Sequence, residues 1–356
     1  MVTILWTSLV LILAFYGLHA VTDRHFVQSL DAIAKRLRMT SDVAGATLMA
    51  MGSSAPELFT SLLALLKGTE FGNLGAGTIV GSAIFNILVI IGISAMIRRA
   101  VLTWQPVIRD MIFYIGSILL LYWVFRDGLI TLIESVYFVI FYAVYLIALP
   151  LWRRILPYID GADGIEEQHV ANNGPKVWYM KWSTPIDRAL DSVMPDMEKN
   201  PRSVTLVFFL SIVAICGLSW VLVEAGVILA QEIGLSYAVI GLTVLAVGTS
   251  VPDLLASVIV ARQGKGDMAV SNAVGSNIFD ILVGLGVVWM VIILMRGEPI
   301  PISQENLDSS IILLLSTVAA LLFLLIVRRW AIGRNAGLVL ILMYVGYLYM
   351  AVMGYL

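Results

Sequence analysis

The sequence is poor in charged residues. Only 13% of its 356 residues are Asp, Glu, Lys or Arg, whereas 60% are hydrophobic, and the mean hydropathy is +0.95. Soluble domains carry about 25% charged residues, so this composition excludes an ordinary soluble enzyme and indicates a chain embedded in a lipid bilayer. The net charge of −2 gives no reason to expect nucleic acid or another polyanion as a partner.

Cysteine and histidine are scarce as well. Cys216 is the single cysteine, so the chain forms neither an internal disulfide nor a metal site made of cysteines. The three histidines, His19, His25 and His169, have no metal-ligand spacing. Any ion site predicted from this sequence must therefore be built from oxygen atoms.

Long apolar runs occupy most of the chain. A membrane-spanning helix needs about 20 apolar residues, and we predict an all-α integral membrane protein with ten transmembrane helices. The first run has no basic residue before Arg24, so we interpret it as a span rather than a cleaved signal peptide. The predicted spans are 3–21, 42–66, 74–97, 107–125, 129–151, 204–229, 236–261, 268–295, 307–327 and 333–354.

The basic residues predict the orientation of these spans. If the N-terminus lies outside, all but three of the 22 lysines and arginines fall in loops on the inner side, the exceptions being Lys67, Arg126 and Arg296. Both termini are then outside, and the polar connection 153–203 is cytoplasmic. The part from Pro185 to Met194 has apolar residues at helical spacing and is either a short interfacial helix or a solvated linker.

Two sequence blocks occur twice. Residues 45–62 match 241–258 at eight of eighteen positions, and residues 80–92 match 274–286 at nine of thirteen. This self-similarity predicts two five-helix repeats, 1–152 and 204–356, joined by the linker 153–203. Because five is odd, the second repeat enters the bilayer in the opposite sense. Inverted repeats of this kind place the binding site of a transporter at their interface, near the bilayer midplane.

The first block of each repeat carries an acid in the middle of a span. Glu57 and Asp253 are costly there, because a charge at the bilayer centre is unfavourable by about 2.5–3.5 kcal/mol. Each follows a proline, Pro56 or Pro252, which has no N–H to donate to the carbonyl four residues earlier and so predicts a local helix break. In each span, two hydroxyl oxygens are predicted on the same helix face as the acid. They belong to Ser53 and Ser54 in the first repeat, and to Thr249 and Ser250 in the second.

The second block adds polar residues at matching positions. Ser82 with Asn86, and Ser276 with Asp280, stand four residues apart and so share a helix face. Carboxylates, hydroxyls and freed carbonyls are the ligands that hard cations such as calcium prefer, so we predict a cation site at these residues. Glu134 and Glu224 lie toward the outer ends of spans, where they are either solvated or line an entrance.

These blocks resemble the repeats of the cation/calcium exchanger superfamily. The segments GSSAPELFTS and GTSVPDLLAS, with GTIVGSAIFNIL and AVGSNIFDIL, are most similar to the potassium-dependent sodium/calcium exchanger branch. The resemblance is tight over 42–97 and 236–295 and implies calcium export driven by sodium entry. It adds no cofactor beyond the transported calcium, sodium and, in this branch, potassium. The long regulatory insertion of animal sodium/calcium exchangers is absent from the sequence.

The resemblance also implies roles for single residues. Glu57 and Asp253 would be carboxylates shared by calcium and sodium, with Asn86 and Asp280 completing the ring. Asp280 is linked to potassium dependence, although some potassium-independent relatives carry Asp there too. Ser53 and Thr249 would offer carbonyls to calcium, and the flanking sodium sites would use Ser54, Ser250, Ala50, Ala246, Ser82 and Ser276.

Other functions remain open from the sequence. Calcium/proton exchange is a sibling interpretation, because carboxylates can also carry protons. A channel could share the same site. An intramembrane aspartyl protease using Asp253 and Asp280 is a third alternative, but the segments VPDLL and IFDIL lack the GxGD-type signature, and the repeat would go unexplained.

Overall fold

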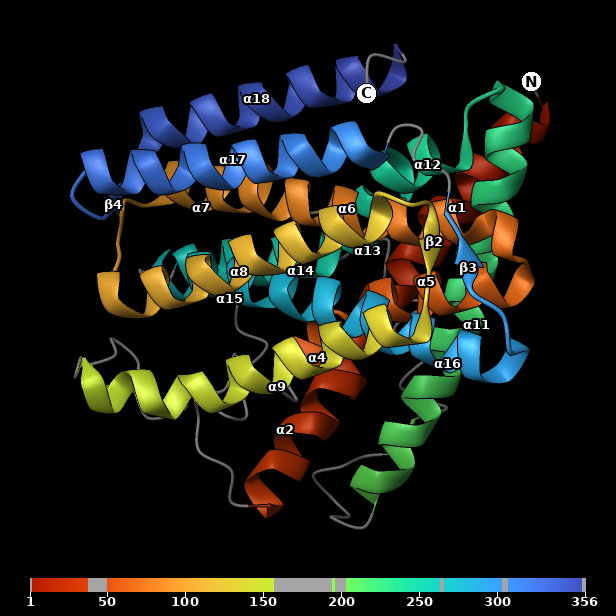
Figure 1. Cartoon of the computed structure of the whole chain (residues 1–356), viewed down its shortest axis with the longest axis horizontal. Coiled ribbons are helices and arrows are strands. Elements are labelled where there is room, and N and C mark those ends of the chain that lie inside the picture. The colour runs from red at the N-terminus through yellow and green to blue at the C-terminus, as the bar shows by residue number, and fades with distance from the viewer. Residues whose placement is uncertain are drawn as a thin grey trace.

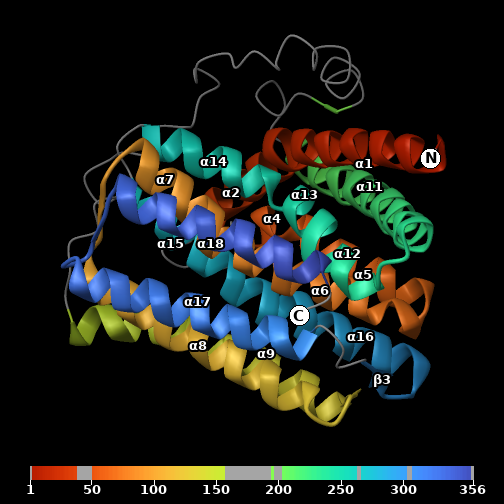
Figure 2. The ribbon, with the colours of Figure 1, turned by 90° about the horizontal axis from the view of Figure 1, so that it is seen from above.

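The computed structural model describes residues 2–37, 50–156, 194–195, 203–262, 266–302 and 307–353. It is a bundle of helices, most of which run along one common direction (Figures 1 and 2). The predicted interfacial helix from Pro185 lies outside the described residues, apart from Met194.

The first part of the chain forms helices that match the first predicted repeat. α1, η1 and α2 make one continuous rod, as do α6, η4 and α7. The elements are α1 (Val2–Val21), η1 (Thr22–Phe26), α2 (Val27–Arg36), α4 (Ala50–Ser53), α5 (Ala55–Lys67), η3 (Thr69–Phe71), α6 (Gly72–Phe85), η4 (Asn86–Ile90), α7 (Ile91–Ile97), β1 (Ala100–Val101), α8 (Trp104–Phe125), β2 (Leu129–Ile130) and α9 (Leu132–Ile155).

The second part has a similar order of elements. Here η5 and η6, like η1 and η4 before them, are π-helical segments inside longer helices. The elements are α11 (Ser203–Ile233), α12 (Tyr237–Ile240), η5 (Gly241–Leu245), α13 (Ala246–Thr249), α14 (Val251–Arg262), α15 (Gly266–Phe279), η6 (Asp280–Leu285), α16 (Gly286–Arg296), β3 (Ile300–Pro301), α17 (Leu307–Val327), β4 (Ala331–Ile332) and α18 (Arg334–Val352).

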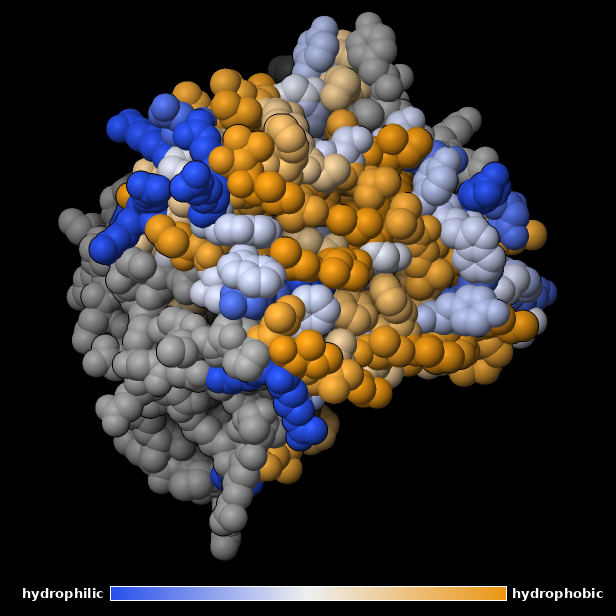
Figure 3. All heavy atoms as spheres, turned by 60° about the vertical axis from the view of Figure 1, so that its left-hand side comes forward, coloured by the Kyte–Doolittle hydropathy of each residue, from blue (hydrophilic) through white to orange (hydrophobic). Residues whose placement is uncertain are grey.

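Eight helical stretches of the described chain are long and apolar enough to cross a membrane. The other two predicted spans, 42–66 and 236–261, contain interrupted helices, so length alone does not identify them. Residues 42–49 of the first of these spans lie outside the described residues. A broad hydrophobic band covers the outside between hydrophilic ends (Figure 3). Exposed apolar side chains are stable in contact with lipid. The helices form their backbone hydrogen bonds internally, so they leave no unpaired backbone groups in the lipid. The chain is a multi-pass membrane protein.

Two short antiparallel sheets connect the two parts of the chain. β1 pairs with β4, with Ala100 opposite Ile332, and β2 pairs with β3, with Ile130 opposite Ile300. β1 and β3 each follow the second motif block of their repeat, whereas β2 and β4 each join its last two helices. The pairing is therefore reciprocal between the two parts of the chain, although runs of two residues gave no signal in the sequence.

The buried hydrophobic residues form two clusters. The larger one extends over α6 to α9 and α15 to α18 and includes Trp289 and Tyr347. The smaller one joins the rod of α1 and α2 to α11, which packs beside it, and to the apolar faces of α5 and α12 (Figures 1 and 2). The interrupted helices lie between the two clusters, so residues at their breaks face neither lipid nor water.

Candidate functional site

Each interrupted helix is broken at a serine, and the helix that follows the break has proline as its second residue. The break is at Ser54 (φ −89°, ψ 3°) between α4 and α5, and at Ser250 (φ −88°, ψ 2°) between α13 and α14. Proline fits the first turn of a helix because no N–H is needed there. The helix breaks predicted from Pro56 and Pro252 are therefore present, and they have the same backbone conformation.

Each break places an acid at the start of a new helix. Glu57 lies in the first turn of α5, and Asp253 lies in the first turn of α14. The N-terminus of a helix carries a partial positive charge, which stabilises a nearby carboxylate. The short helices α4 and α13 end at the same points and direct carbonyl oxygens there. Ala50 and Ser53 lie on α4, and Ala246 and Thr249 lie on α13.

The two acids meet across the interface between the parts of the chain. The Ser250 hydroxyl donates a hydrogen bond to Glu57 Oε1 over 3.2 Å. Thr249 also lies beside Glu57, and Glu57 and Asp253 are close enough for their charges to interact. Both side chains are buried, Glu57 at 2% and Asp253 at 4% exposure.

The companion helices bring in the other two predicted members. Asn86 is the first residue of η4, and Asp280 is the first residue of η6. π-helical segments are rare and are often found at functional sites, so their occurrence at two equivalent positions is notable. Ser54 lies next to Asp280, whose charge interacts with those of Glu57 and Asp253.

Each serine of these companion helices donates its hydroxyl hydrogen to a backbone carbonyl of its own helix. Ser82 donates to the Ile79 carbonyl over 3.0 Å, and Ser276 donates to the Ala273 carbonyl over 3.4 Å. Ser276 also accepts a hydrogen bond of 3.4 Å from Asn86 Nδ2. A hydroxyl whose hydrogen is used in this way presents lone pairs to its remaining surroundings.

Four buried oxygens of this region have no hydrogen-bond partner among the described residues. They belong to four predicted site residues: Ser54 Oγ, Glu57 Oε2, Asn86 Oδ1 and Asp280 Oδ1. None of the three carboxylates forms an ion pair with a described Lys or Arg. Buried polar groups without partners are costly, and oxygen atoms of these kinds can bind a cation.

The acids do not form a metal cage by themselves. Across the described residues, no group of three or more His, Cys, Asp or Glu side chains is close enough together to hold a metal ion. A cation here would have to draw on hydroxyl, amide and backbone oxygens as well, which is the mixture of ligands that calcium and sodium accept.

Two further acids of the spans serve local structure. Glu134 forms a capping box with Thr131 at the start of α9, with its carboxylate accepting the Thr131 backbone N–H over 2.8 Å. Glu224 forms an ion pair with Lys67 and accepts a hydrogen bond of 3.2 Å from Trp220 Nε1. Both have structural partners away from the helix breaks at Ser54 and Ser250.

Sequence reasoning missed one residue of the region. Asn277 is fully buried, and its side chain bonds to Asn86, to the Ala83 carbonyl and to Tyr114. The available signal was a difference between the repeats, because Asn277 stands where the first repeat has Ala83. Comparing only identical positions hides such a residue.

Comparisons with known proteins agree with this picture. The family described as "Sodium/calcium exchanger protein" matches residues 7–150 and 203–353. The chain is 28% identical to sodium/potassium/calcium exchanger 1 of Gallus gallus, with 95% of this chain and 77% of the relative aligned. It is 30% identical to sodium/potassium/calcium exchanger 5 of Homo sapiens, with 95% and 81% aligned.

Solved structures with the same fold include two exchangers. The sodium-calcium exchanger NCX_Mj soaked with Na+ and Sr2+ aligns with a TM-score of 0.58 at 23% identity, covering 96% of this chain and 97% of the other. The H+/Ca2+ exchanger CAX aligns with a TM-score of 0.66 at 15% identity, covering 98% and 81%.

Proposed function

Because the chain belongs to the sodium/calcium exchanger protein family, we propose that it is a secondary antiporter that exports calcium in exchange for sodium by alternating access. One observation carries the proposal. Four buried oxygens have no hydrogen-bond partner among the described residues: Glu57 Oε2 and Asp280 Oδ1, which belong to carboxylates, and Ser54 Oγ and Asn86 Oδ1. None of the carboxylates of Glu57, Asp253 and Asp280 forms an ion pair with a described Lys or Arg. Such a region is electrostatically unfavourable unless a cation binds in it or protons neutralise its carboxylates, and its oxygen ligands suit a hard cation.

The transported ions would share this one site. Glu57, Asp253 and Asp280 supply three negative charges, of which one calcium ion balances two. Sodium ions would compete for the same carboxylates, because calcium and several sodium ions together would leave excess buried positive charge. This competition couples the two fluxes. The remaining negative charge leaves room for one monovalent cation beside calcium, which fits potassium co-transport, and the family resemblance links that role to Asp280.

The full ligand set that we propose is the one that the family resemblance implies. Glu57 and Asp253 would bind both calcium and sodium, with Asn86 and Asp280 opposite them. Carbonyls of Ser53 and Thr249 would add to the calcium site. The flanking sodium sites would use Ala50, Ala246, Ser54, Ser250, Ser82 and Ser276.

The proposed architecture is ten spans in two inverted repeats, 1–152 and 204–356. Three features support it: the equal φ and ψ at Ser54 and Ser250, the π-helical segments that begin at Asn86 and Asp280, and the reciprocal pairing of the four strands. The family match also falls into two stretches, one in each proposed repeat.

Calcium flux in proteoliposomes tests the function. A sodium gradient is expected to drive uptake of calcium-45, and potassium is expected to increase it. Uptake that ignores the sodium gradient would refute sodium coupling. Uptake driven by a pH jump without sodium would favour calcium/proton exchange instead, for which the CAX fold and the carboxylates are the grounds.

Neutralising the shared carboxylates gives the first site prediction. Glu57→Gln and Asp253→Asn keep the side-chain size but remove a charge needed to balance calcium, so each is expected to abolish gradient-driven calcium flux. Glu134→Gln is the matched control, because Glu134 caps α9 and lies away from the site. Wild-type flux in either site variant would remove that residue from the proposed ligand set.

A further inference from the structure

The buried amide of Asn277 forms a complete set of hydrogen bonds. Its Nδ2 donates to the Ala83 carbonyl over 3.1 Å and to the Tyr114 hydroxyl over 2.8 Å, while its Oδ1 accepts from Asn86 Nδ2 over 2.8 Å. An amide side chain has two N–H donors, so both donors of Asn277 are engaged.

The Ala83 carbonyl fixes which way this amide points. A backbone carbonyl only accepts hydrogen bonds, so the nitrogen of Asn277 must face it and the oxygen must face Asn86. Rotating the amide by half a turn would place two oxygens against each other. Asn277 therefore presents an acceptor to Asn86, and its own oxygen is occupied.

The orientation of Asn86 follows from that of Asn277. Both N–H donors of Asn86 are used, one on Asn277 Oδ1 and the other on Ser276 Oγ over 3.4 Å. Its Oδ1 is the atom left without a described partner. The amide thus turns its oxygen, and not its nitrogen, toward the remaining open direction, as a cation ligand requires.

The two repeats differ here for a chemical reason. Asn86 in the first repeat corresponds to Asp280 in the second, and Asn277 in the second corresponds to Ala83 in the first. A carboxylate has two equivalent oxygens and needs no partner to orient it. An amide has one oxygen and one nitrogen, so only one of its two orientations presents an oxygen to a cation, and a partner can favour that orientation.

We propose that Asn277 is a positioning residue that orients the Asn86 amide so that its oxygen faces the transported cation. The proposal rests on the ion site argued above, and Asn277 acts on it only through Asn86. Mutation of a residue that orients a metal ligand commonly lowers the metal affinity by about ten- to hundredfold.

A double-mutant cycle tests this dependence. Calcium affinity is measured on the full-length purified protein from the rise in melting temperature as calcium is titrated, and KM and maximal rate come from flux. Asn277→Ala is expected to weaken calcium binding by about tenfold. In an Asn86→Ala background the same change is expected to have no further effect. Equal losses in both backgrounds, or no loss in the wild-type background, would overturn the proposal.

A second variant does not depend on truncating Asn277. Asn86→Asp adds a negative charge but places a carboxylate oxygen against Asn277 Oδ1, so it is expected to bind calcium more weakly than the wild type. Adding Asn277→Ala to Asn86→Asp removes that repulsion and is expected to restore affinity. Tighter calcium binding by Asn86→Asp alone would contradict the assigned amide orientation.

Tyr114→Phe serves as the control, because it removes a bond to Asn277 while leaving the Ala83 and Asn86 bonds in place. Its calcium affinity is expected to equal that of the wild type. If the wild type binds calcium but shows no gradient-driven flux, the exchanger function fails while the binding data still decide the role of Asn277. If it does not bind calcium, both fail.

Discussion

In the proposed ion site, the Glu57 side chain is held by a hydrogen bond from a neighbouring serine. Glu57 accepts a hydrogen bond from Ser250, which belongs to the other part of the chain, so the carboxylate of one repeat is placed by a hydroxyl of the other. This contact joins the two helix breaks directly. Its loss should therefore affect ion binding more than the loss of a similar serine elsewhere.

Ser250→Ala tests the contact. A hydrogen bond to a charged group contributes about 1.5–3 kcal/mol, and about 1.4 kcal/mol corresponds to a tenfold change in affinity. We therefore expect the KM for calcium to rise by about tenfold or more in the flux assay. Ser211→Ala is the control, because Ser211 is equally buried but lies on α11. Equal effects of the two substitutions would argue against a specific role for Ser250.

The charged residues of the proposed site stand out in the sequence more clearly than the residues that hold them. A carboxylate in the middle of a span stands out because it is costly there, and its repetition marked Glu57 and Asp253. Asn277 did not stand out, since a buried amide more often forms a bond between helices. Its role depends on the direction of the Ala83 carbonyl, which is a property of the fold.

At the scale of elements, small residues set how closely the motif helices approach. A Cβ added to Gly77 of α6 would lie 2.7 Å from the Ala238 carbonyl oxygen, and one added to Gly241 of η5 would meet the Leu74 carbonyl. The backbones are thus in direct contact, as is common where small residues line membrane helix interfaces. This contact fixes the distance between the second block of one repeat and the first block of the other.

Gly77→Ala is expected to push these helices apart. Overpacking of this kind costs about 1–3 kcal/mol, so the melting temperature in detergent should fall and calcium flux should decrease. Gly346→Ala on α18 is the matched control, because nothing lies within 4 Å of the Cβ that it adds. A melting temperature unchanged by Gly77→Ala would show that the interface is looser than its geometry indicates.

Prolines and π-helical segments differ in how far the sequence reveals them. Pro56 and Pro252 predicted the breaks because proline has no backbone N–H to donate, whatever its surroundings in the fold. The π-helical segments at Asn86 and Asp280 follow from one extra residue per turn in the hydrogen-bond register, and no residue type requires that. The sequence therefore did not predict them, although it marked the polar residues with which they begin.

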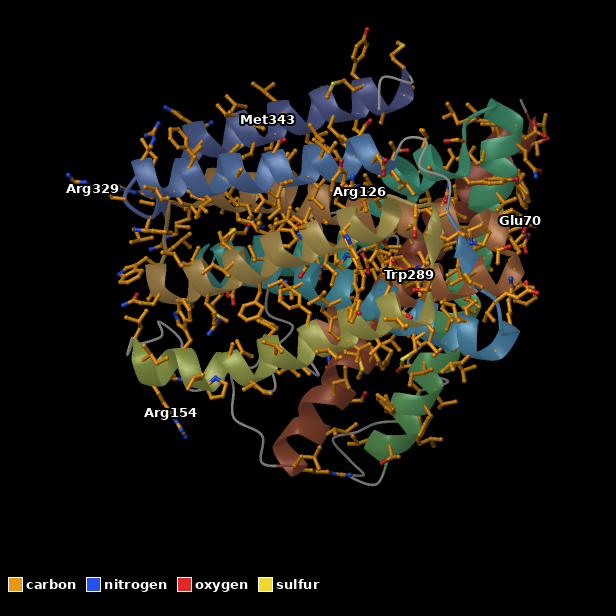
Figure 4. All side chains as sticks on the ribbon, in the orientation of Figure 1. Glu70, Arg126, Arg154, Trp289, Arg329 and Met343 are labelled. Carbon is orange, nitrogen blue, oxygen red and sulfur yellow. The ribbon has the colours of Figure 1, made fainter. Side chains whose placement is uncertain are left out.

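At the scale of the whole molecule, the two sheets mark opposite ends of the bundle. β1 and β4 lie beside the basic loops that contain Arg98 and Arg329, whereas β2 and β3 lie at the end where α5 finishes (Figure 1). Figure 4 shows Arg329 and Glu70 at opposite ends of the molecule. The predicted sidedness places Arg329 inside and Glu70 outside.

Cysteine labelling tests that sidedness. In a Cys216→Ser background, which removes the single cysteine, Glu70→Cys is expected to react with a membrane-impermeant maleimide added outside intact cells. Arg329→Cys is expected to react only after the membrane is permeabilised. The reverse pattern would invert the proposed topology, and labelling of both from outside would contradict the predicted span count.

The two sheets also limit which parts of the molecule can move. Each pairs a loop of the first repeat with a loop of the second, so the larger hydrophobic cluster is clamped at both of its ends. These pairings oppose a motion in which the two parts of the chain separate at either end of the larger cluster. The freedom needed to uncover the ion site from alternate sides would then belong to α1 and α11, which pack within the smaller cluster and carry none of the paired strands.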